Sequence, residues 1–220
     1  MLLIENLTKI FNPDTIDQKI ALNDVSITIE KGDFVTVIGS NGAGKTTLLN
    51  LISGTYLPEN GRIVIDGIDV TKLPEHKRAK YLGRIFQDPL MGTAASMAIE
   101  ENLGMADLRG KTRTLRWGVN RSRRDHYRDI LKTMGLGLEK RLKQSVSLLS
   151  GGQRQSLTLS MVTLTLPKLL LLDEHTAALD PKTAKRVMEL TQTIISENKL
   201  TAIMVTPVSY THLTLPTSCG

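Results

Sequence analysis

A glycine-rich segment that ends in lysine and threonine carries the clearest chemical signal in the chain. Its spacing is G-x-x-x-x-G-K-[ST], which is typical of loops that bind the phosphates of a nucleotide. The residues are Gly39, Ser40, Asn41, Gly42, Ala43, Gly44, Lys45 and Thr46. Glycines let backbone N–H groups approach a phosphate, and the start of a helix favours an anion. We expect Lys45 to reach the β- and γ-phosphates, the Thr46 hydroxyl to bind Mg²⁺, and Thr47 to be a further nucleotide contact.

Two carboxylates follow an apolar run and form a second candidate group. Leu169–Leu172 has the pattern of a buried strand, and Asp173 and Glu174 come directly after it. In an open α/β sheet, ligands bind at this edge. An acidic pair in this position is often only a helix cap, but its occurrence with a phosphate loop favours catalysis. We expect Asp173 to hold Mg²⁺ through water, and Glu174 to orient or deprotonate an attacking water.

A third motif narrows the class of protein. Ser150 has the type and position of a helix N-cap, and Gly151, Gly152 and Gln153 follow it. The run Leu149–Gln155, with the sequence LSGGQRQ, resembles the signature of the ATP-binding cassette (ABC) ATPases. The resemblance implies that two subunits pair head to tail, and that residues 150–153 of each subunit contact the ATP bound by the other.

Further positions match this family residue by residue. Gln87 resembles the loop glutamine that contacts Mg²⁺ and the attacking water, which makes it a candidate metal and catalytic residue. The segment Ala178–Asp180 resembles the loop that contacts the opposite subunit. Phe11 is a candidate for stacking on adenine, with a buried core role as the alternative. His175 replaces a proline that is frequent after the catalytic acid, and we expect it to lie on the surface.

The elements that must position these residues alternate between strands and helices. The sequence predicts strands over 2–9, 21–29, 34–38, 61–65, 82–86, 169–172 and 202–205. It predicts one helix after the phosphate loop, one with the stripe Tyr127, Ile130, Leu131 and Met134 that ends at Gly135, and one from Pro181. Alternation of this kind indicates an α/β fold with a parallel sheet. The continuous apolar pattern of 34–38 predicts a strand buried on both faces.

The family resemblance adds detail to this architecture. It implies a P-loop (RecA-like) core with an antiparallel β subdomain, formed by residues 1–90 and 146–206, and an inserted helical subdomain over 91–145. The insertion contains a basic stretch, for which a solvated face is the simplest interpretation. The stretch comprises Arg109, Lys111, Arg113, Arg116, Arg121, Arg123, Arg124 and Arg128.

Composition excludes several classes of protein. The chain has 220 residues, a formal net charge of +6 and a single cysteine, Cys219, so a disulfide-stapled miniprotein is excluded. No apolar stretch is long enough to cross a bilayer, and no signal peptide opens the chain. We therefore expect a cytoplasmic protein. The basic stretch lacks the interleaved aromatic residues of single-strand binders, and we expect no nucleic-acid partner.

The last residues do not fit the pattern of the rest. The family has a histidine directly after its last strand, whereas here Thr206 is followed by Pro207. The run Pro207–Thr217 also matches the one-frame translation of a common transposase sequencing adapter. We expect residues 207–220 to be a non-native tail that replaces a native histidine and further residues. The alternative is a genuine tail in which His212 supplies the missing group. We expect the printed chain to hydrolyse ATP poorly.

Taken with the resemblance, these features predict the ATP-hydrolysing subunit of an importer, bound to the cytoplasmic face of the membrane. Its ligands would be ATP and Mg²⁺. Its partners would be a second nucleotide-binding subunit, a separate permease and, indirectly, a solute-binding protein. The runs Gly83–Pro89 and Asp173–Asp180 resemble importers of amino-acid type, particularly the branched-chain group. The rival hypothesis is a soluble cassette ATPase that acts on nucleic acid or ribosomes.

Overall fold

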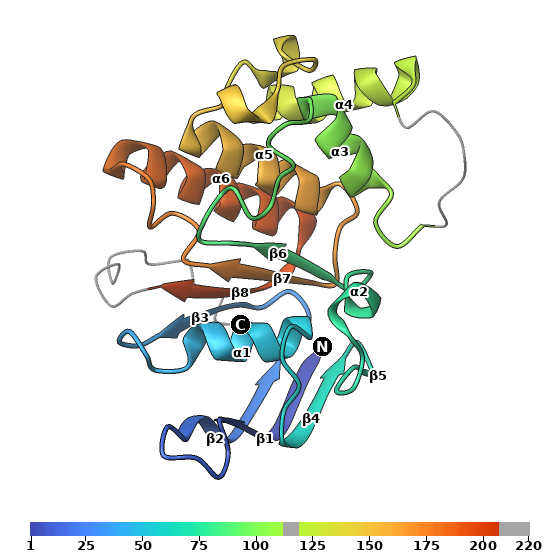
Figure 1. The fold of residues 1–220 in the computed structure, drawn as a ribbon. Helices are drawn as coiled ribbons and strands as arrows, with labels where there is room; N and C mark the ends of the chain where they lie inside the picture. Colours follow the sequence, from blue (N-terminus) through green and yellow to red (C-terminus); the bar gives the residue numbers. More distant parts are fainter. Residues whose placement is uncertain (112–118, 207–220) are drawn as a thin grey trace, which may run out of the picture.

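The computed structural model describes residues 1–111 and 119–206, which form two sheets and several helices (Figure 1). The strands are β1 (Leu2–Phe11), β2 (Lys19–Ile29), β3 (Phe34–Ile38), β4 (Asn60–Ile65), β5 (Ile68–Asp69), β6 (Leu82–Ile85), β7 (Leu169–Asp173) and β8 (Thr201–Thr206). The helices are α1 (Lys45–Ser53), α2 (Glu75–Arg78), α3 (Ile99–Asp107), α4 (Arg121–Thr133), α5 (Gly151–Thr163) and α6 (Pro181–Asn198), with short 3₁₀ turns at Leu138–Lys140 and Val146–Leu148.

One sheet is parallel, in the order β3-β8-β7-β6, and it carries the predicted catalytic residues at its carboxyl edge. Its strand β7 is buried throughout. Leu169 and Leu171 pack into the core on one side of this sheet, and Leu170 and Leu172 pack into the core on the other. This alternation is the period of two that a strand imposes on its side chains. Both faces of β7 are therefore covered, as its apolar run predicts.

The prediction that residues 34–38 are buried on both faces is wrong. Strand β3 forms an end of the parallel sheet, where β8 is its neighbour, within the described part of the chain. Residues 34–37 are half-buried, and Ile38 is 52% exposed. A short β-branched run is therefore compatible with an edge position as well as with a central one.

The second sheet is antiparallel, in the order β2-β1-β4-β5. Helix α1 lies between the two sheets (Figure 1), and its Leu49 and Ile52 are fully buried in the core that they share. The fully buried Arg78 donates hydrogen bonds to the carbonyls of Leu51 and Ile52 at the end of α1 (2.6 and 3.0 Å). These bonds satisfy carbonyls that a helix end leaves without a partner. The helix that begins in the phosphate loop is thus anchored at its far end.

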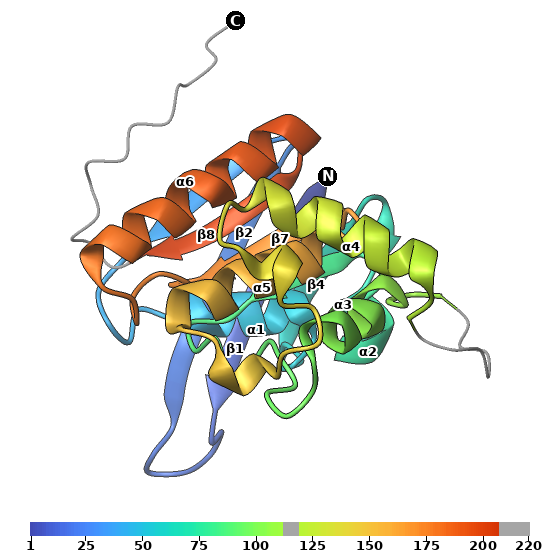
Figure 2. The same ribbon diagram turned by 90° about the horizontal axis from the view of Figure 1, so that it is seen from above.

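Helices α5 and α6 cover the opposite face of the parallel sheet (Figures 1 and 2). Beyond them, α3, α4 and α5 enclose a core of their own that includes Leu103, Tyr127 and Leu131. The predicted amphipathic stripe is confirmed: Tyr127, Leu131 and Met134 are buried, Ile130 is half-buried, and Gly135 has a positive φ of 63° just after the helix. This arrangement places Ser150 and the start of α5 in the helical region.

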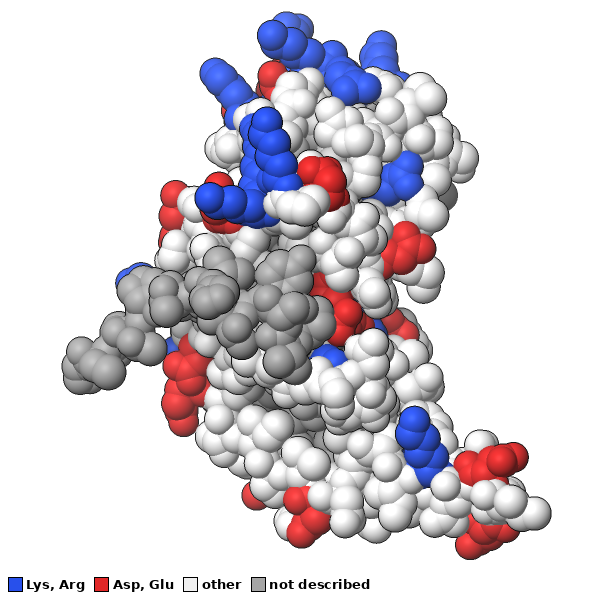
Figure 3. Space-filling model, turned by 90° about the vertical axis from the view of Figure 1, so that its left-hand side faces the viewer, with Lys and Arg blue, Asp and Glu red and all other residues white. Residues whose placement is uncertain are grey.

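The basic stretch lies mostly in this helical region, where blue side chains gather at one end of the molecule (Figure 3). Arg113 and Arg116 lie outside the described residues. Lys111 and Arg123 both pair with Asp107, at 2.9 and 3.6 Å. Arg124 pairs with Glu100 at 2.6 Å, and Arg128 pairs with Asp125 at 2.6 Å. The hydrogen bond from Arg124 lowers the pKa of Glu100 below its usual value. These basic side chains therefore balance neighbouring carboxylates.

Candidate nucleotide site

The phosphate loop has the shape that its glycines allow. Gly42 and Gly44 both have a φ of +84°, and Gly44 is the residue directly before α1. A Cβ atom at Gly44 would lie 2.5 Å from the carbonyl oxygen of Ala21 on β2, a distance that no side chain can accept. The loop therefore needs glycine here for two reasons, the backbone angle and the close approach of β2.

The buried Lys45 spans the loop and reaches a carboxylate. Its side chain is 6% exposed, and its Nζ donates to the carbonyls of Gly39 and Ser40 (2.9 and 3.1 Å). The same nitrogen lies 3.7 Å from Oε1 of Glu174. Gly39 and Ser40 thus act on Lys45 through their backbone. A cation held at this point can attract phosphate oxygens without leaving the loop.

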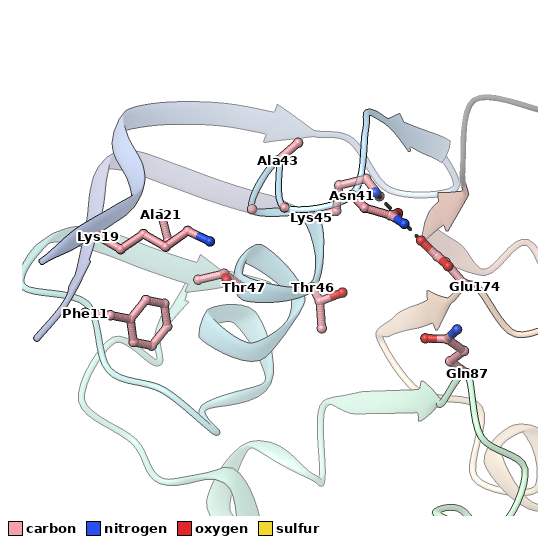
Figure 4. Close-up of a pocket in the computed structure, with 12 residues that line it drawn as sticks. Phe11, Lys19, Ala21, Asn41, Ala43, Lys45, Thr46, Thr47, Gln87 and Glu174 are labelled. Carbon is pink, nitrogen blue, oxygen red and sulfur yellow. Dashed lines mark ion pairs between the residues drawn. The ribbon is translucent and has the colours of Figure 1, made fainter. Parts of the chain in front are cut away.

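Asp173 and Glu174 stand at the end of β7, as predicted. The hydroxyl of Thr46 donates to Oδ1 of Asp173 at 3.4 Å. The backbone N–H of Glu174 donates to the carbonyl of Val205 at 3.1 Å, and Glu174 has a φ of +41°. A positive φ is rare for a residue with a long side chain and occurs frequently at functional sites. The chain turns sharply here and directs Glu174 toward Lys45 (Figure 4).

A pocket of about 360 Å³ brings most of the predicted residues together (Figure 4). Its lining consists of Phe11, Lys19, Ala21, Asn41, Gly42, Ala43, Gly44, Lys45, Thr46, Thr47, Gln87 and Glu174. Gln87 also lines an adjoining pocket of about 340 Å³ together with Asp173. No sequence motif includes Lys19 or Ala21. Lys19 pairs with Phe11 across strands β1 and β2, so only the sheet register places it here.

Phe11 lines this pocket and is half-buried, so it is not a core residue. Its ring packs edge-on against Tyr56, with ring centroids 5.3 Å apart and planes at 80°. The Nζ of Lys9 lies 5.3 Å from the ring centroid. These contacts fix the ring in the lining of the pocket, which suits an aromatic side chain that offers a face to a base.

The signature residues lie in a different place. Ser150 accepts from the N–H of Gln153 (3.3 Å), and the Gln153 side chain accepts from the N–H of Ser150 (3.2 Å). This reciprocal pair is a capping box at the start of α5. Ser150, Gly152 and Gln153 line a separate pocket with residues of α4 and α6, and a Cβ at Gly151 would lie 3.2 Å from a methyl carbon of Leu179. Within one chain, the signature does not line the phosphate-loop pocket.

The expectation that His175 lies on the surface is wrong. Its side chain is 2% exposed, and Nε2 lies 3.2 Å from the hydroxyl of Thr191. That hydroxyl donates to the carbonyl of Val187 (2.8 Å), so Nε2 must be the donor in the contact with His175. Burial lowers the pKa of His175 to about 4. A neutral histidine therefore packs beneath the turn that carries Glu174.

The residues around Thr46 fit a magnesium ion in chemical type. The hydroxyl of Thr46 and the carboxylate of Asp173 are hard oxygen donors, and they lie close enough to share one ion. Mg²⁺ is usually held by one or two carboxylates together with substrate phosphates.

The two tail residues His212 and Cys219 lie outside the described residues.

Comparison with known proteins agrees with this geometry. Residues 22–177 match the family model described as ABC transporter. A tyrosine transport ATP-binding protein of Clostridioides difficile is 47% identical over 94% of this chain and 82% of its own length. A methionine import ATP-binding protein of Corynebacterium efficiens is 34% identical over 91% of this chain, and this chain spans about half (54%) of that relative.

Solved structures of similar shape are ABC cassettes. The cassette MJ0796, solved as a dimer in a post-hydrolysis state with ADP and Pi, superposes with a TM-score of 0.79 at 28% identity, over 94% of this chain and 88% of that one. The ADP form of the cassette MJ1267 gives 0.76 at 26% identity, over 93% and 80% of the two chains. These comparisons confirm the predicted α/β cassette fold and the predicted ligand ATP. The chain belongs to the ABC transporter family, as one of its ATP-binding ATPases.

Proposed function

We propose that this ATPase energises the uptake of a small solute, with an amino acid as the solute class. The observation that carries the proposal is the convergence of Lys45, Thr46 and Glu174 on one pocket at the edge of the parallel sheet. The solute class rests on the tyrosine and methionine transport functions named for the relatives. No helix among residues 1–111 and 119–206 is long and apolar enough to span a membrane. We assign the membrane passage to a separate permease.

The proposed mechanism uses positioning and charge more than covalent chemistry. The loop N–H groups and Lys45 bind the β- and γ-phosphates, and Phe11 packs against adenine. Thr46, Asp173 and Gln87 would hold Mg²⁺, which would neutralise charge on the phosphates when bound. Glu174 orients the attacking water and accepts its proton. Lys45 lies 3.7 Å from Glu174 and so keeps the base and the γ-phosphate position close together.

The proposed cycle needs two chains. Ser150, Gly151, Gly152 and Gln153 stand at the positive end of α5, which favours an anion. Since these residues do not line the pocket of their own chain, we propose that they complete the site of a second copy. ATP then acts as the link that closes the pair, and hydrolysis lets it open.

The proposed permease contact lies next to Gln87 and on the helical insertion, residues 91–145. Leu90 and Met91 follow Gln87 closely and are 51% and 68% exposed. We propose that these two exposed apolar side chains contribute to the contact with the permease. We place the assembled protein at the cytoplasmic face of the membrane. A solute-binding protein would be an indirect partner, acting through the permease.

A direct test compares the chain with its Glu174→Gln and Lys45→Ala variants. We expect Glu174→Gln to bind a fluorescent ATP analogue as tightly as the parent and to lower single-turnover hydrolysis by at least about 10²-fold. In size-exclusion chromatography with ATP, this variant should elute as a dimer. Lys45→Ala should lose nucleotide binding. Hydrolysis by the parent above the rate without protein, left unchanged in Glu174→Gln, would refute the assigned base.

A further inference from the structure

Arg84 lies in β6 and its guanidinium reaches the end of the neighbouring strand. Its side chain is 11% exposed, and Nη2 lies 3.0 Å from Oδ2 of Asp173, whose side chain is 8% exposed. Nη1 donates to the hydroxyl of Ser53 at 3.2 Å, and the guanidinium carbon lies 4.7 Å from the ring centroid of Phe86. Arg84 is thus held by contacts with β7, with α1 and with the residue that follows its own strand.

The two oxygens of Asp173 have separate partners. Oδ2 accepts from Arg84, while Oδ1 faces the hydroxyl of Thr46 at 3.4 Å. A carboxylate that is fixed at one oxygen cannot rotate freely, so the direction of the other oxygen is set as well. Arg84 therefore leaves Oδ1 on the side of the phosphate loop.

We propose that Arg84 is the positioning residue of Asp173, and that it directs Oδ1 toward the metal that accompanies the nucleotide. This inference rests on the proposed function, in which Asp173 holds Mg²⁺. Partners of this kind, which bind a metal ligand and not the metal, commonly orient the ligand and tune its affinity for the ion. Arg84 lies within the run Gly83–Pro89 that resembles amino-acid importers, but the resemblance assigns it no role.

A purely structural ion pair is the alternative, and its energetics argue against it. Burying two charges costs desolvation, and well-packed apolar residues of similar volume frequently stabilise a fold at least as well. The rest of β6 follows that pattern, because Leu82 and Ile85 are buried in the apolar cores. A charged residue in this strand is explained if the Asp173 carboxylate is needed for another purpose and requires a counter-ion.

The test measures metal binding directly and separately from turnover. Mn²⁺ is titrated into the full chain with saturating ADP, and free Mn²⁺ is followed by electron paramagnetic resonance. We expect Arg84→Met to weaken Mn²⁺ binding about 10- to 100-fold, the range typical for such partners, and Arg84→Lys to restore part of it. Binding of ADP in EDTA should stay unchanged, because Lys45 and the loop remain. Arg62→Met, which removes an exposed arginine that pairs with Asp69 (2.9 Å), is the matched control.

A second variant pair separates positioning from structure. In an Asp173→Asn background, Arg84→Met should cause no further loss of Mn²⁺ affinity, because its target is gone. This double variant removes both buried charges, so it stays measurable if Arg84→Met alone does not fold. An unchanged Mn²⁺ affinity in Arg84→Met, or an added loss in the double variant, would overturn the inference. If Asp173→Asn itself leaves Mn²⁺ affinity unchanged, the proposed metal role of Asp173 fails instead.

Discussion

At the scale of single residues, the chemistry of the site depends on which buried side chains have a partner of opposite charge and which are buried as neutral groups. Lys45 and Asp173 each lie beside a partner of opposite sign, Glu174 and Arg84. His175 lies next in sequence to Glu174, yet it is buried as a neutral ring bonded to Thr191. Neighbours in sequence thus meet opposite surroundings, because the sharp turn after β7 sends their side chains in different directions.

The buried His175 predicts a pH dependence of stability. Its folded pKa of about 4 lies below the ordinary value of 6.5, so the unfolded chain binds a proton that the folded chain excludes. The contribution of His175 to the free energy of unfolding is present above pH 6.5 and is lost as pH falls toward 4. Between pH 5 and 6 the free energy of unfolding therefore changes by about 1 kcal/mol per pH unit. We expect His175→Gln, which keeps a donor for Thr191, to lose this part of the slope.

Urea unfolding at pH 5, 6 and 7 measures the effect. His76→Gln is the matched control, because His76 is exposed and its replacement should leave the slope as it is in the parent. A parent and a His175→Gln variant with the same slope would contradict the burial of a neutral ring at this position.

The residues that motifs could predict are those set by local spacing. The phosphate loop, Asp173, Glu174 and Ser150 each lie at the end of an element whose own pattern is clear. Lys19, Arg84 and the burial of His175 depend on contacts between segments far apart in the chain. Arg84 and Asp173, for example, meet only because β6 and β7 pair in a given register. No local sequence pattern predicts such contacts.

At the scale of elements, the site depends on how closely β2 and the phosphate loop approach. Gly44 and Gly67 both have a positive φ, of 84° and 79°. A Cβ at Gly44 meets the Ala21 carbonyl at 2.5 Å, whereas nothing lies within 4 Å of a Cβ at Gly67. The two glycines therefore separate backbone strain from crowding.

We expect Gly67→Ala to lower the free energy of unfolding by about 1 kcal/mol, which is the strain of a side chain in the left-handed region. Gly44→Ala should cost about 1–3 kcal/mol more because of the clash, and should also impair nucleotide binding by moving the loop away from β2. Chemical unfolding and binding of a fluorescent ADP analogue measure both effects. Equal stability of the two variants would show that β2 yields to the added methyl group.

Strand boundaries were predictable where polarity changes, and less so where it does not. The sequence predicts β7 over 169–172, and the strand ends at Asp173. It predicts β8 over 202–205, and the strand covers Thr201–Thr206. The sequence does not predict the edge position of β3, because edge and central strands share the same short apolar pattern. Only the pairing order distinguishes them, and that order is a property of the whole sheet.

At the scale of the whole molecule, the proposed pairing of two chains assigns the signature a task beyond capping. The Ser150 side chain caps α5 by accepting from the N–H of Gln153. Aspartate is as good an N-cap as serine and favours the positive helix end. Ser150→Asp should therefore keep the fold, while its new charge repels the γ-phosphate of an ATP bound by the partner chain.

We expect Ser150→Asp, in a Glu174→Gln background, to unfold at the same urea concentration as the parent and to bind ATP equally well as a monomer. The ATP-dependent dimer should disappear in size-exclusion chromatography. Asn120→Asp is the matched control, because Asn120 caps α4 by accepting from the N–H of Arg123 (2.9 Å), so it adds the same charge at another helix start. That control should still dimerise. A Ser150→Asp chain that dimerises like the control would show that the signature serves only its own helix, because a carboxylate facing a bound triphosphate could not be tolerated.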